Sequence, residues 1–117
     1  MTNQEVEEEL IKLLKENNDK QVIVEGKRDK QALCSFGFKK ILTLSKGIYE
    51  TTEDLKEKEV LILTDFDSEG REIAKKFNSI LQPLGYKVDK ETRRKVDFMF
   101  NKLNIRKIEE LRGVLNG

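Results

Sequence analysis

The sequence predicts an α/β fold with a sheet of about four strands, mainly parallel, and helices on both faces of the sheet. Two observations predict it. After a first helix, extended and helical patterns alternate about four times along the 117 residues, which is typical of a parallel sheet with helical crossovers. The extended segments are short apolar runs rich in β-branched residues, as in strands that are buried on both faces.

The elements follow one another in a regular order. Strands are predicted at residues 21–26, 40–44, 59–64 and 86–88. Helices are predicted at residues 3–17, 28–36, 51–58, 70–82, 91–103 and 106–115. The first helix carries apolar residues at helical spacing, Thr2 or Asn3 can cap it, and Asn17-Asn18 ends it.

Local signals mark the other boundaries. Gly37 is expected to close the second helix, and Thr51 or Thr52 is expected to begin the third. Pro83 breaks the fourth helix. Asn104 is expected to cap the last one. The run EVLILT, residues 59–64, is the clearest buried strand.

Length and composition narrow the classes of function. The chain fits one domain, residues 1–117. It has no histidine, which excludes Ser-His and Cys-His catalysis and zinc bound by histidine. Its single cysteine, Cys34, excludes an internal disulfide and is expected to be buried. The net charge of +1 argues against a highly basic nucleic-acid binder, so any such binding would use a local patch.

No targeting signal is apparent. The N-terminal stretch MTNQEVEEEL is acidic and lacks the order of a signal peptide. No apolar run approaches the ~20 residues that a membrane span needs. A cytoplasmic location without a membrane partner is therefore expected.

Acidic residues follow two of the predicted strands. Glu25 ends the first strand, and Asp65 and Asp67 follow the third. Residues two apart in extended backbone point the same way. Ligand sites of parallel sheets lie beyond the carboxyl ends of the strands. If the first and third strands are neighbours, the three carboxylates share one small volume.

Such a cluster requires a compensating charge. Two like charges about 4 Å apart repel by roughly 4 kcal/mol at an effective dielectric near 20, whereas a helix N-terminus recovers only about 0.3–1 kcal/mol. A divalent cation resolves the conflict, and carboxylates with phosphate oxygens suit Mg²⁺, with Mn²⁺ as a substitute. The simpler interpretation is that these acids are solvated loop residues and helix N-caps.

The two acidic segments resemble the motifs of the Toprim domain, the catalytic unit shared by topoisomerases, bacterial-type primases and several nucleases. The first motif is a strand ending in Glu-Gly, similar to VIVEGKRD with Glu25, Gly26 and Asp29. The second is a strand ending in Asp-x-Asp, similar to LILTDFDSEG with Asp65 and Asp67. Further matches lie at Glu69, at Gly70 and in the loop Ser45-Lys46-Gly47.

The resemblance covers roughly residues 20–90, with helices at about 91–115 beyond it. It implies a Rossmann-like sheet. It implies Asp65 and Asp67 as Mg²⁺ ligands and catalytic residues, with Glu25 as a general acid/base or a further ligand. Glu69 is expected as an additional helper at the metal.

The chain also departs from the larger members of this family. Phe66 stands where topoisomerases and some nucleases usually carry a proline. Tyr49 and Tyr86 lie inside the small fold, so they are expected to be packing residues and not nucleophiles. The additional regions of a primase are absent from the sequence. What remains resembles the stand-alone small Toprim proteins, and the nearest enzymatic analogues are the Toprim ribonuclease that matures 5S ribosomal RNA and Toprim DNA endonucleases.

Basic and glycine residues near the strand ends are candidates for nucleic-acid contacts, although each is more often a solvated surface residue. These candidates are Gly26, Lys27, Arg28, Lys46, Gly47, Gly70 and Arg71. A second patch, Arg93-Arg94-Lys95 with Arg106-Lys107, is either a solvated helix face or a surface for RNA or a ribosome. Phe98 is expected to pack, with a homodimer contact or base stacking as alternatives.

Four functions remain open from the sequence. The first is a Mg²⁺-dependent nuclease, with structured RNA favoured over DNA. The second is a non-catalytic module that binds RNA, a ribosome or a protein. The third is nucleotidyl transfer, which the missing regions disfavour. The fourth is an ordinary flavodoxin-like domain that binds a small phosphate and uses the acids as caps.

Overall fold

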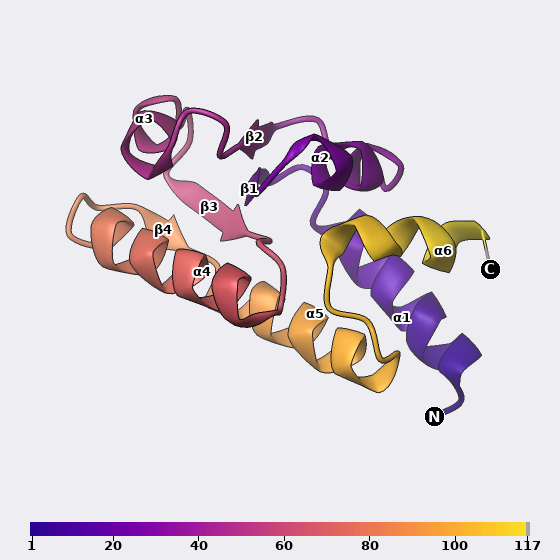
Figure 1. Cartoon of the computed structure of the whole chain (residues 1–117). Helices are drawn as coiled ribbons and strands as arrows, with labels where there is room; N and C mark the ends of the chain where they lie inside the picture. Colours follow the sequence, from indigo (N-terminus) through magenta and orange to yellow (C-terminus); the bar gives the residue numbers. More distant parts are fainter. Residues whose placement is uncertain (117) are drawn as a thin grey trace.

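The computed structural model describes residues 1–116 and places a four-stranded sheet between helices (Figure 1). The strands are β1 (Gln21–Val24), β2 (Ile41–Thr43), β3 (Glu59–Ile62) and β4 (Lys87–Val88). The helices are α1 (Asn3–Glu16), α2 (Lys27–Cys34), α3 (Ile48–Glu53), α4 (Ser68–Leu81), α5 (Lys90–Lys102), the 3₁₀-helix η1 (Ile108–Glu110) and α6 (Leu111–Asn116).

All strand pairs are parallel, and the sheet order is β2-β1-β3-β4. The predicted α/β class is therefore confirmed. β1 and β3 are the two central strands, and Val22 lies opposite Leu61 in their register. The chain crosses from β1 to β2 and back past β1 to β3, so the carboxyl ends of the central strands lie side by side.

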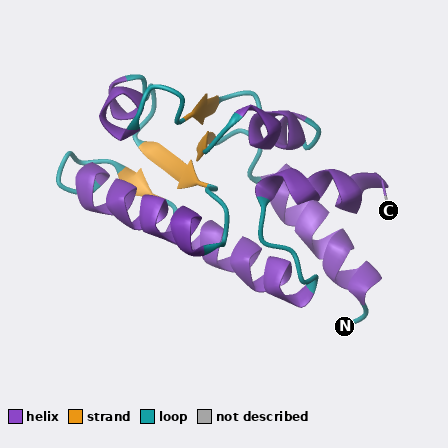
Figure 2. Ribbon diagram, in the orientation of Figure 1, coloured by secondary structure: helices purple, strands orange, loops and turns teal. Residues whose placement is uncertain are grey.

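The two faces of the sheet carry separate apolar cores. Alternate residues of a strand point to opposite faces. One face, with Val22 and Leu61, packs against α1, α2, α5 and η1. The other face, with Ile23 and Ile62, packs against α4 through Ala74, Phe77 and Leu81. Figure 2 shows the helices around the sheet, with α1 and α6 near each other at the two ends of the described chain.

The caps of α1 and α2 follow their sequences closely. Thr2 and Glu5 form a reciprocal capping box at the start of α1. After α2, Gly37 adopts a φ of 93°, a left-handed conformation that glycine tolerates best. An added Cβ there would also press on the Asn18 side chain. The predicted termination at Gly37 is therefore confirmed.

Two local predictions are wrong. The third helix begins at Ile48 instead of Thr51, because Gly47 turns the backbone with a φ of 97°. Thr51 lies inside this helix, and its hydroxyl donates to the Gly47 carbonyl at 2.6 Å. Asn104 does not cap the last helix; with a φ of 57° it ends α5. This conformation lets the Ile105 N–H return to the Phe100 carbonyl at 3.0 Å.

Three side-chain predictions are also wrong. Phe98, which was expected to pack, is 61% exposed on α5. Cys34 is exposed, because the buried positions of α2 are Asp29, Ala32 and Leu33. Tyr49 is 71% exposed and therefore does not pack in the core, although Tyr86 does contact the α4-side core. No helix among the described residues is long and apolar enough to cross a membrane.

Candidate metal site

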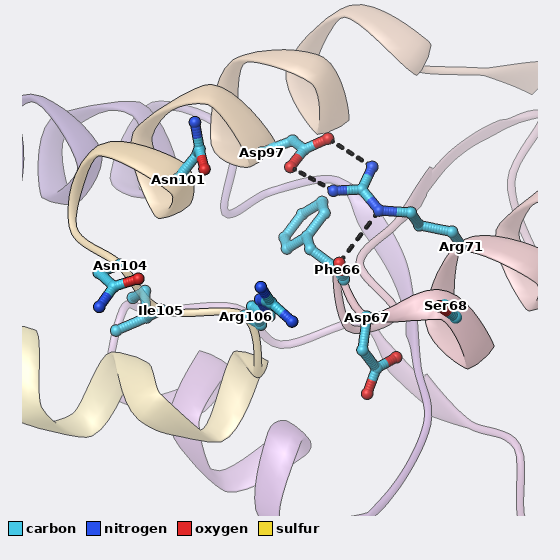
Figure 3. Close-up of a pocket in the computed structure, with 9 residues that line it drawn as sticks. All are labelled: Phe66, Asp67, Ser68, Arg71, Asp97, Asn101, Asn104, Ile105 and Arg106. Carbon is cyan, nitrogen blue, oxygen red and sulfur yellow. Dashed lines mark hydrogen bonds and ion pairs between the residues drawn. The ribbon is translucent and has the colours of Figure 1, made fainter.

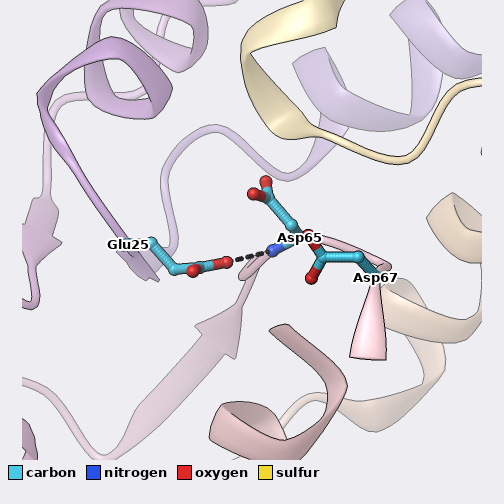
Figure 4. A group of neighbouring side chains, drawn as sticks. All are labelled: Glu25, Asp65 and Asp67. Carbon is cyan, nitrogen blue, oxygen red and sulfur yellow. Dashed lines mark hydrogen bonds between the residues drawn. The ribbon is translucent and has the colours of Figure 1, made fainter. Parts of the chain in front are cut away.

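Three acidic side chains converge beyond the carboxyl ends of the central strands. Glu25 follows β1, and Asp65 and Asp67 follow β3. One carboxylate oxygen of each lies within 4.8 Å of the corresponding oxygens of the other two. Figure 4 shows Glu25 reaching across from β1 to the loop that carries both aspartates. The pairing of β1 with β3 produces this convergence, as the sequence predicted.

A backbone N–H orients each carboxylate. The Asp65 N–H donates to Glu25 Oε2 at 2.8 Å. The Ile108 N–H donates to Asp65 Oδ1 at 2.8 Å. The Gly70 N–H donates to Asp67 Oδ1 at 2.8 Å, which makes Asp67 the N-cap of α4. Within residues 1–116 the other oxygen of each carboxylate accepts no hydrogen bond, so three oxygens remain for a ligand.

Burial and mutual repulsion disfavour three negative charges here. Burial raises the pKa of Glu25, and the charges of Asp65, Asp67 and Asp29 raise it further, against the hydrogen bond from the Asp65 N–H. Burial and the charge of Asp67 raise the pKa of Asp65 in the same way, against the hydrogen bond from Ile108 and the charge of Lys107. A bound cation would reverse both effects, since it favours the charged carboxylates.

Gly70 and Thr64 hold the loop that carries the aspartates. A Cβ at Gly70 would overlap the backbone of Asp65, so only glycine fits. The buried Thr64 hydroxyl donates to the Gly70 carbonyl at 2.7 Å. These two contacts fix the conformation of the turn between β3 and α4. Phe66, at the position of the family's usual proline, is buried against the Phe100 ring, with 5.0 Å between ring centroids.

Arg93 supports the same loop from α5. Its guanidinium donates to the carbonyls of Ile62, Thr64 and Asp65 at 3.1, 2.9 and 3.3 Å. It also lies over the Phe66 ring, 4.5 Å from the centroid. Burial lowers the pKa of Arg93 to about 10, which still leaves it charged at neutral pH. The sequence grouped Arg93 with a surface patch, and the structure corrects this.

The other predicted metal helper lies apart from the three acids. Glu69 is exposed on the first turn of α4 and is not a member of the converging group. Asp29, from the Glu-Gly motif, is buried and accepts a hydrogen bond from the Gly26 N–H at 3.1 Å. It therefore closes the turn into α2. Burial and the charge of Asp65 raise the pKa of Asp29.

The residues predicted to contact nucleic acid differ in exposure and in the bonds that they already form within the protein. Lys27 and Arg28 are exposed on the first turn of α2, and Arg28 lies 3.9 Å from Glu109. The loop of Lys46 and Gly47 begins beside Glu25, because the Leu44 N–H donates to the Glu25 carbonyl.

Two other candidates are already engaged. Gly70 is buried, and its N–H is bound to Asp67. Arg71 forms a two-pronged ion pair with Asp97 at 2.9 and 3.1 Å. It also donates to the Phe66 carbonyl at 3.0 Å. Neither group is free to bind a phosphate without rearrangement.

The C-terminal segment contributes to the site, which the sequence did not reveal. Ile108 binds Asp65 directly, and the Phe66 N–H donates to the Arg106 carbonyl at 2.7 Å. The charges of Lys107 and Glu109 act on Asp65 in opposite directions. No local signal marks Ile108, since it contributes only a backbone N–H. The inward position of Arg93 could have been predicted from the sequence, because Arg93 lies three residues before the buried Val96 and so on the same side of the helix.

Comparison with known proteins identifies the family. The model of the Toprim domain matches residues 20–99. The chain belongs to the Toprim family. The Toprim match extends beyond the predicted core of residues 20–90 to include most of α5. It implies Mg²⁺-dependent nucleic-acid metabolism in general, and Toprim domains typically bind the ion through acidic residues.

Relatives of this Toprim chain occur in archaea. It is 41% identical to a UPF0292 protein of Pyrococcus abyssi over 112 residues, covering 93% of the chain and 83% of that protein. It is 37% identical to a UPF0292 protein of Methanocaldococcus jannaschii over 114 residues, covering 92% and 88%. A solved structure of a protein from Aquifex aeolicus superposes with a TM-score of 0.73 at 34% identity, covering 88% of this chain and 95% of that one.

The donor set of the Toprim site fits Mg²⁺. All three converging side chains offer carboxylate oxygens, the hard ligands that this ion prefers. Histidine and cysteine, the ligands of softer metals, are absent from the group. Three acids with one uncommitted oxygen each could hold a single hydrated ion and leave coordination positions for phosphate.

Proposed function

We propose that this chain is a Mg²⁺-dependent nuclease that hydrolyses phosphodiester bonds in structured nucleic acid, with RNA favoured over DNA. The observation that carries the proposal is the convergence of Glu25, Asp65 and Asp67 within 4.8 Å at the carboxyl edge of the sheet. A Toprim match over residues 20–99 supports the same class of chemistry. Mn²⁺ is expected to substitute for Mg²⁺.

Asp65 and Asp67 are the proposed metal ligands, with Glu25 near enough to share the ion. The ion supplies charge neutralisation at the phosphoryl group and a lower pKa for a bound water. The chain's own part is to fix both aspartates, through Ile108 and Gly70, in the orientation described above. This fixed geometry reduces the reorganisation needed when substrate binds.

Glu25 is the proposed general acid or base. Its carboxylate is half-buried and lies within 4.8 Å of the two aspartates. A group that transfers a proton must lie within hydrogen-bond reach of the reacting oxygen. The Asp65 N–H holds Oε2, so Oε1 is the oxygen that would exchange a proton with the attacking or leaving oxygen.

Basic groups around the edge of the sheet are proposed to bind the phosphate backbone. Lys27, Arg28 and Lys46 are exposed there. Gly26 leaves open space beside them, since a Cβ there would meet nothing within 4 Å, and the exposed Gly47 follows Lys46 directly. Lys107 adds a cation close enough to lower the pKa of Asp65. Contacts of this kind give an affinity that falls with salt and carries little sequence information.

A non-catalytic module that binds RNA, a ribosome or a protein is the second candidate. The Arg71–Asp97 ion pair favours it, because a catalytic arginine would be more effective if it were free to meet the phosphate. A homodimer through the exposed Phe98, which is 61% accessible, fits either candidate.

The decisive assay is cleavage of a panel of folded RNAs and duplex DNAs with Mg²⁺ or Mn²⁺. We expect strand cleavage that chelator abolishes and that Glu25→Gln lowers about 10²–10⁴-fold, as for loss of a general acid or base. Glu72→Gln on the exposed side of α4 is the matched control and should leave the rate unchanged. Salt-dependent binding without turnover, even after long incubation with Mn²⁺, would favour the non-catalytic module.

A further inference from the structure

A polar cavity of about 290 Å³ lies next to the acidic site. Asp67 belongs both to the acidic group and to the cavity lining, and Figure 3 shows it among the residues that line the cavity. Its walls are the start of α4, the second half of α5 and the segment between α5 and η1. The lining residues are Phe66, Asp67, Ser68, Arg71, Asp97, Asn101, Asn104, Ile105 and Arg106.

The cavity forms where the C-terminal segment meets the Toprim core. Four of its lining residues, from Asn101 to Arg106, lie beyond the matched residues 20–99. The Phe66 N–H fixes this segment to the aspartate loop by its bond to the Arg106 carbonyl. The cavity therefore depends on the segment that follows the family's common catalytic unit, where a determinant of substrate choice is to be expected.

The charges within the cavity are largely compensated. Arg71 and Asp97 neutralise each other in their two-pronged ion pair, and Asp67 is assigned to the cation. What remains is the guanidinium of Arg106, the amides of Asn101 and Asn104 and the hydroxyl of Ser68. Across the described residues, 1–116, these four side chains make no hydrogen bond or ion pair with other protein groups. The cavity is thus a set of unused donors and acceptors with one surplus positive charge.

We propose that this cavity holds one unpaired purine nucleotide of the substrate, adjacent to the phosphate at the metal site. The inference rests on the proposed function and names the feature that its substrate must carry. Asn pairs with the N6 and N7 atoms of adenine, and Arg pairs with the O6 and N7 atoms of guanine. Guanidinium planes also stack on unpaired bases. These are the groups that the cavity offers.

Size and charge exclude other occupants. The volume of about 290 Å³ is at the lower limit of the roughly 300–1,000 Å³ of ligand pockets, which suits one nucleotide and excludes a base pair. A free phosphate would lie near the carboxylates of Asp67 and Asp97 and could use only the donor groups of the lining, so the side-chain carbonyl oxygens of Asn101 and Asn104 would stay unused. The substrate should therefore present a bulged, looped or terminal purine at the bond that is cleaved.

Nucleotide binding can be tested without turnover. The full chain with Mg²⁺ present is titrated with AMP, GMP, CMP, UMP and inorganic phosphate and followed by amide NMR. We expect AMP and GMP to shift the signals of Ser68, Asn101 and Asn104, with at least tenfold weaker binding of CMP, UMP and phosphate. Because no cleavage is measured, this result is independent of whether the chain proves to be a nuclease.

Variants assign the binding to the cavity. Asn101→Ala and Arg106→Ala should each weaken purine binding about tenfold. Asn104→Gly removes the amide but keeps the positive φ of this position, so it tests recognition without disturbing the end of α5. Arg94→Ala, an exposed arginine of α5 outside the cavity, is the control and should bind as the parent does.

Several results would overturn the inference. These are equal binding of purines and pyrimidines, binding of phosphate as strong as that of AMP, or no shift at millimolar nucleotide in a chain whose other signals show that it is folded. Cleavage in the nuclease assay together with no purine response would keep the proposed function and remove this inference. A purine response without cleavage would keep this inference and remove the proposed nuclease function.

Discussion

Gly70 packs directly against the backbone carbonyl of Asp65, and a Cβ at residue 70 would overlap it. This contact joins the first turn of α4 to the first aspartate of the site. Because the Gly70 N–H also holds Asp67, one small residue positions both aspartates.

We predict that Gly70→Ala lowers the free energy of unfolding by about 1–3 kcal/mol, as overpacking does, and weakens metal binding at the same time. Gly113→Ala is the control, because a Cβ there meets nothing within 4 Å and helix propensity favours alanine. Urea denaturation of both variants measures the difference. A Gly70→Ala protein with unchanged stability and metal affinity would contradict this account of the loop.

Arg93 should be worth more to stability than its neighbour Arg94. Replacing Arg93 by alanine removes three bonds to backbone carbonyls at the end of β3, and buried groups left unpaired cost about 1–3 kcal/mol each. We expect a loss of about 3 kcal/mol for Arg93→Ala, against less than about 0.5 kcal/mol for the exposed Arg94→Ala. Equal effects of the two substitutions in urea denaturation would show that Arg93 does not support the loop.

Glu25→Gln should stabilise the metal-free protein. It removes one of three clustered charges, while a glutamine oxygen can still accept the bond from the Asp65 N–H. We expect a gain of about 1 kcal/mol in EDTA, well below the gross repulsion between charges this close, and a smaller rise of Tm on adding Mg²⁺ than in the parent. Glu72→Gln should change neither quantity. A less stable Glu25→Gln protein in EDTA would mean that repulsion at the site is small.

The ion pair between Lys20 and Asp89 gives a pH-dependent contribution away from the site. Asp89 is partly buried, which opposes its charge, but bonds from Lys20 at 2.6 Å and from Thr92 outweigh this and lower its pKa. A lowered pKa of an acid stabilises the fold above its ordinary value of 3.8, and the contribution is lost as pH falls through the folded pKa. Asp89→Asn should therefore cost about 1–3 kcal/mol at neutral pH.

The pH dependence of the free energy of unfolding checks the sign of this contribution. The stability difference between the parent and Asp89→Asn should be constant at neutral pH and should shrink below about pH 4. A difference that grows as the pH falls would contradict the assignment. Asp54→Asn, whose side chain is 50% exposed and 4.0 Å from Lys46, serves as the surface control.

The sequence was sufficient for the sheet and for the three acids because both depend on local patterns. The run EVLILT predicts a buried strand, and parallel order then places its end beside that of β1. Thr2 and Gly37 likewise act through neighbouring residues. The starts of helices depend less on such local patterns. Thr51 was predicted to begin the third helix, but its hydroxyl forms a hydrogen bond inside that helix instead of at its start.

The rest of the site depends on contacts between distant segments. Ile108 reaches Asp65 across 43 residues through a backbone N–H, a group that every residue except proline carries. The burial of Arg93 and the exposure of Cys34 depend on how α5 and α2 are rotated against the sheet. Such rotations follow from the packing of the whole core. The periodicity of apolar residues in the sequence does not determine them closely enough to say which residue at the margin of a helix face is buried.

The central claim is that Glu25, Asp65 and Asp67 bind one divalent cation, and calorimetric titration with Mg²⁺ and Mn²⁺ tests it most directly. The best variant is Asp67→Asn, since asparagine also caps helices and should keep α4 intact; Asp54→Asn is its matched control. We predict one ion per chain for the parent and the control, and at least tenfold weaker binding for Asp67→Asn. Equal binding by parent and Asp67→Asn, or no binding by the folded parent, would contradict the account.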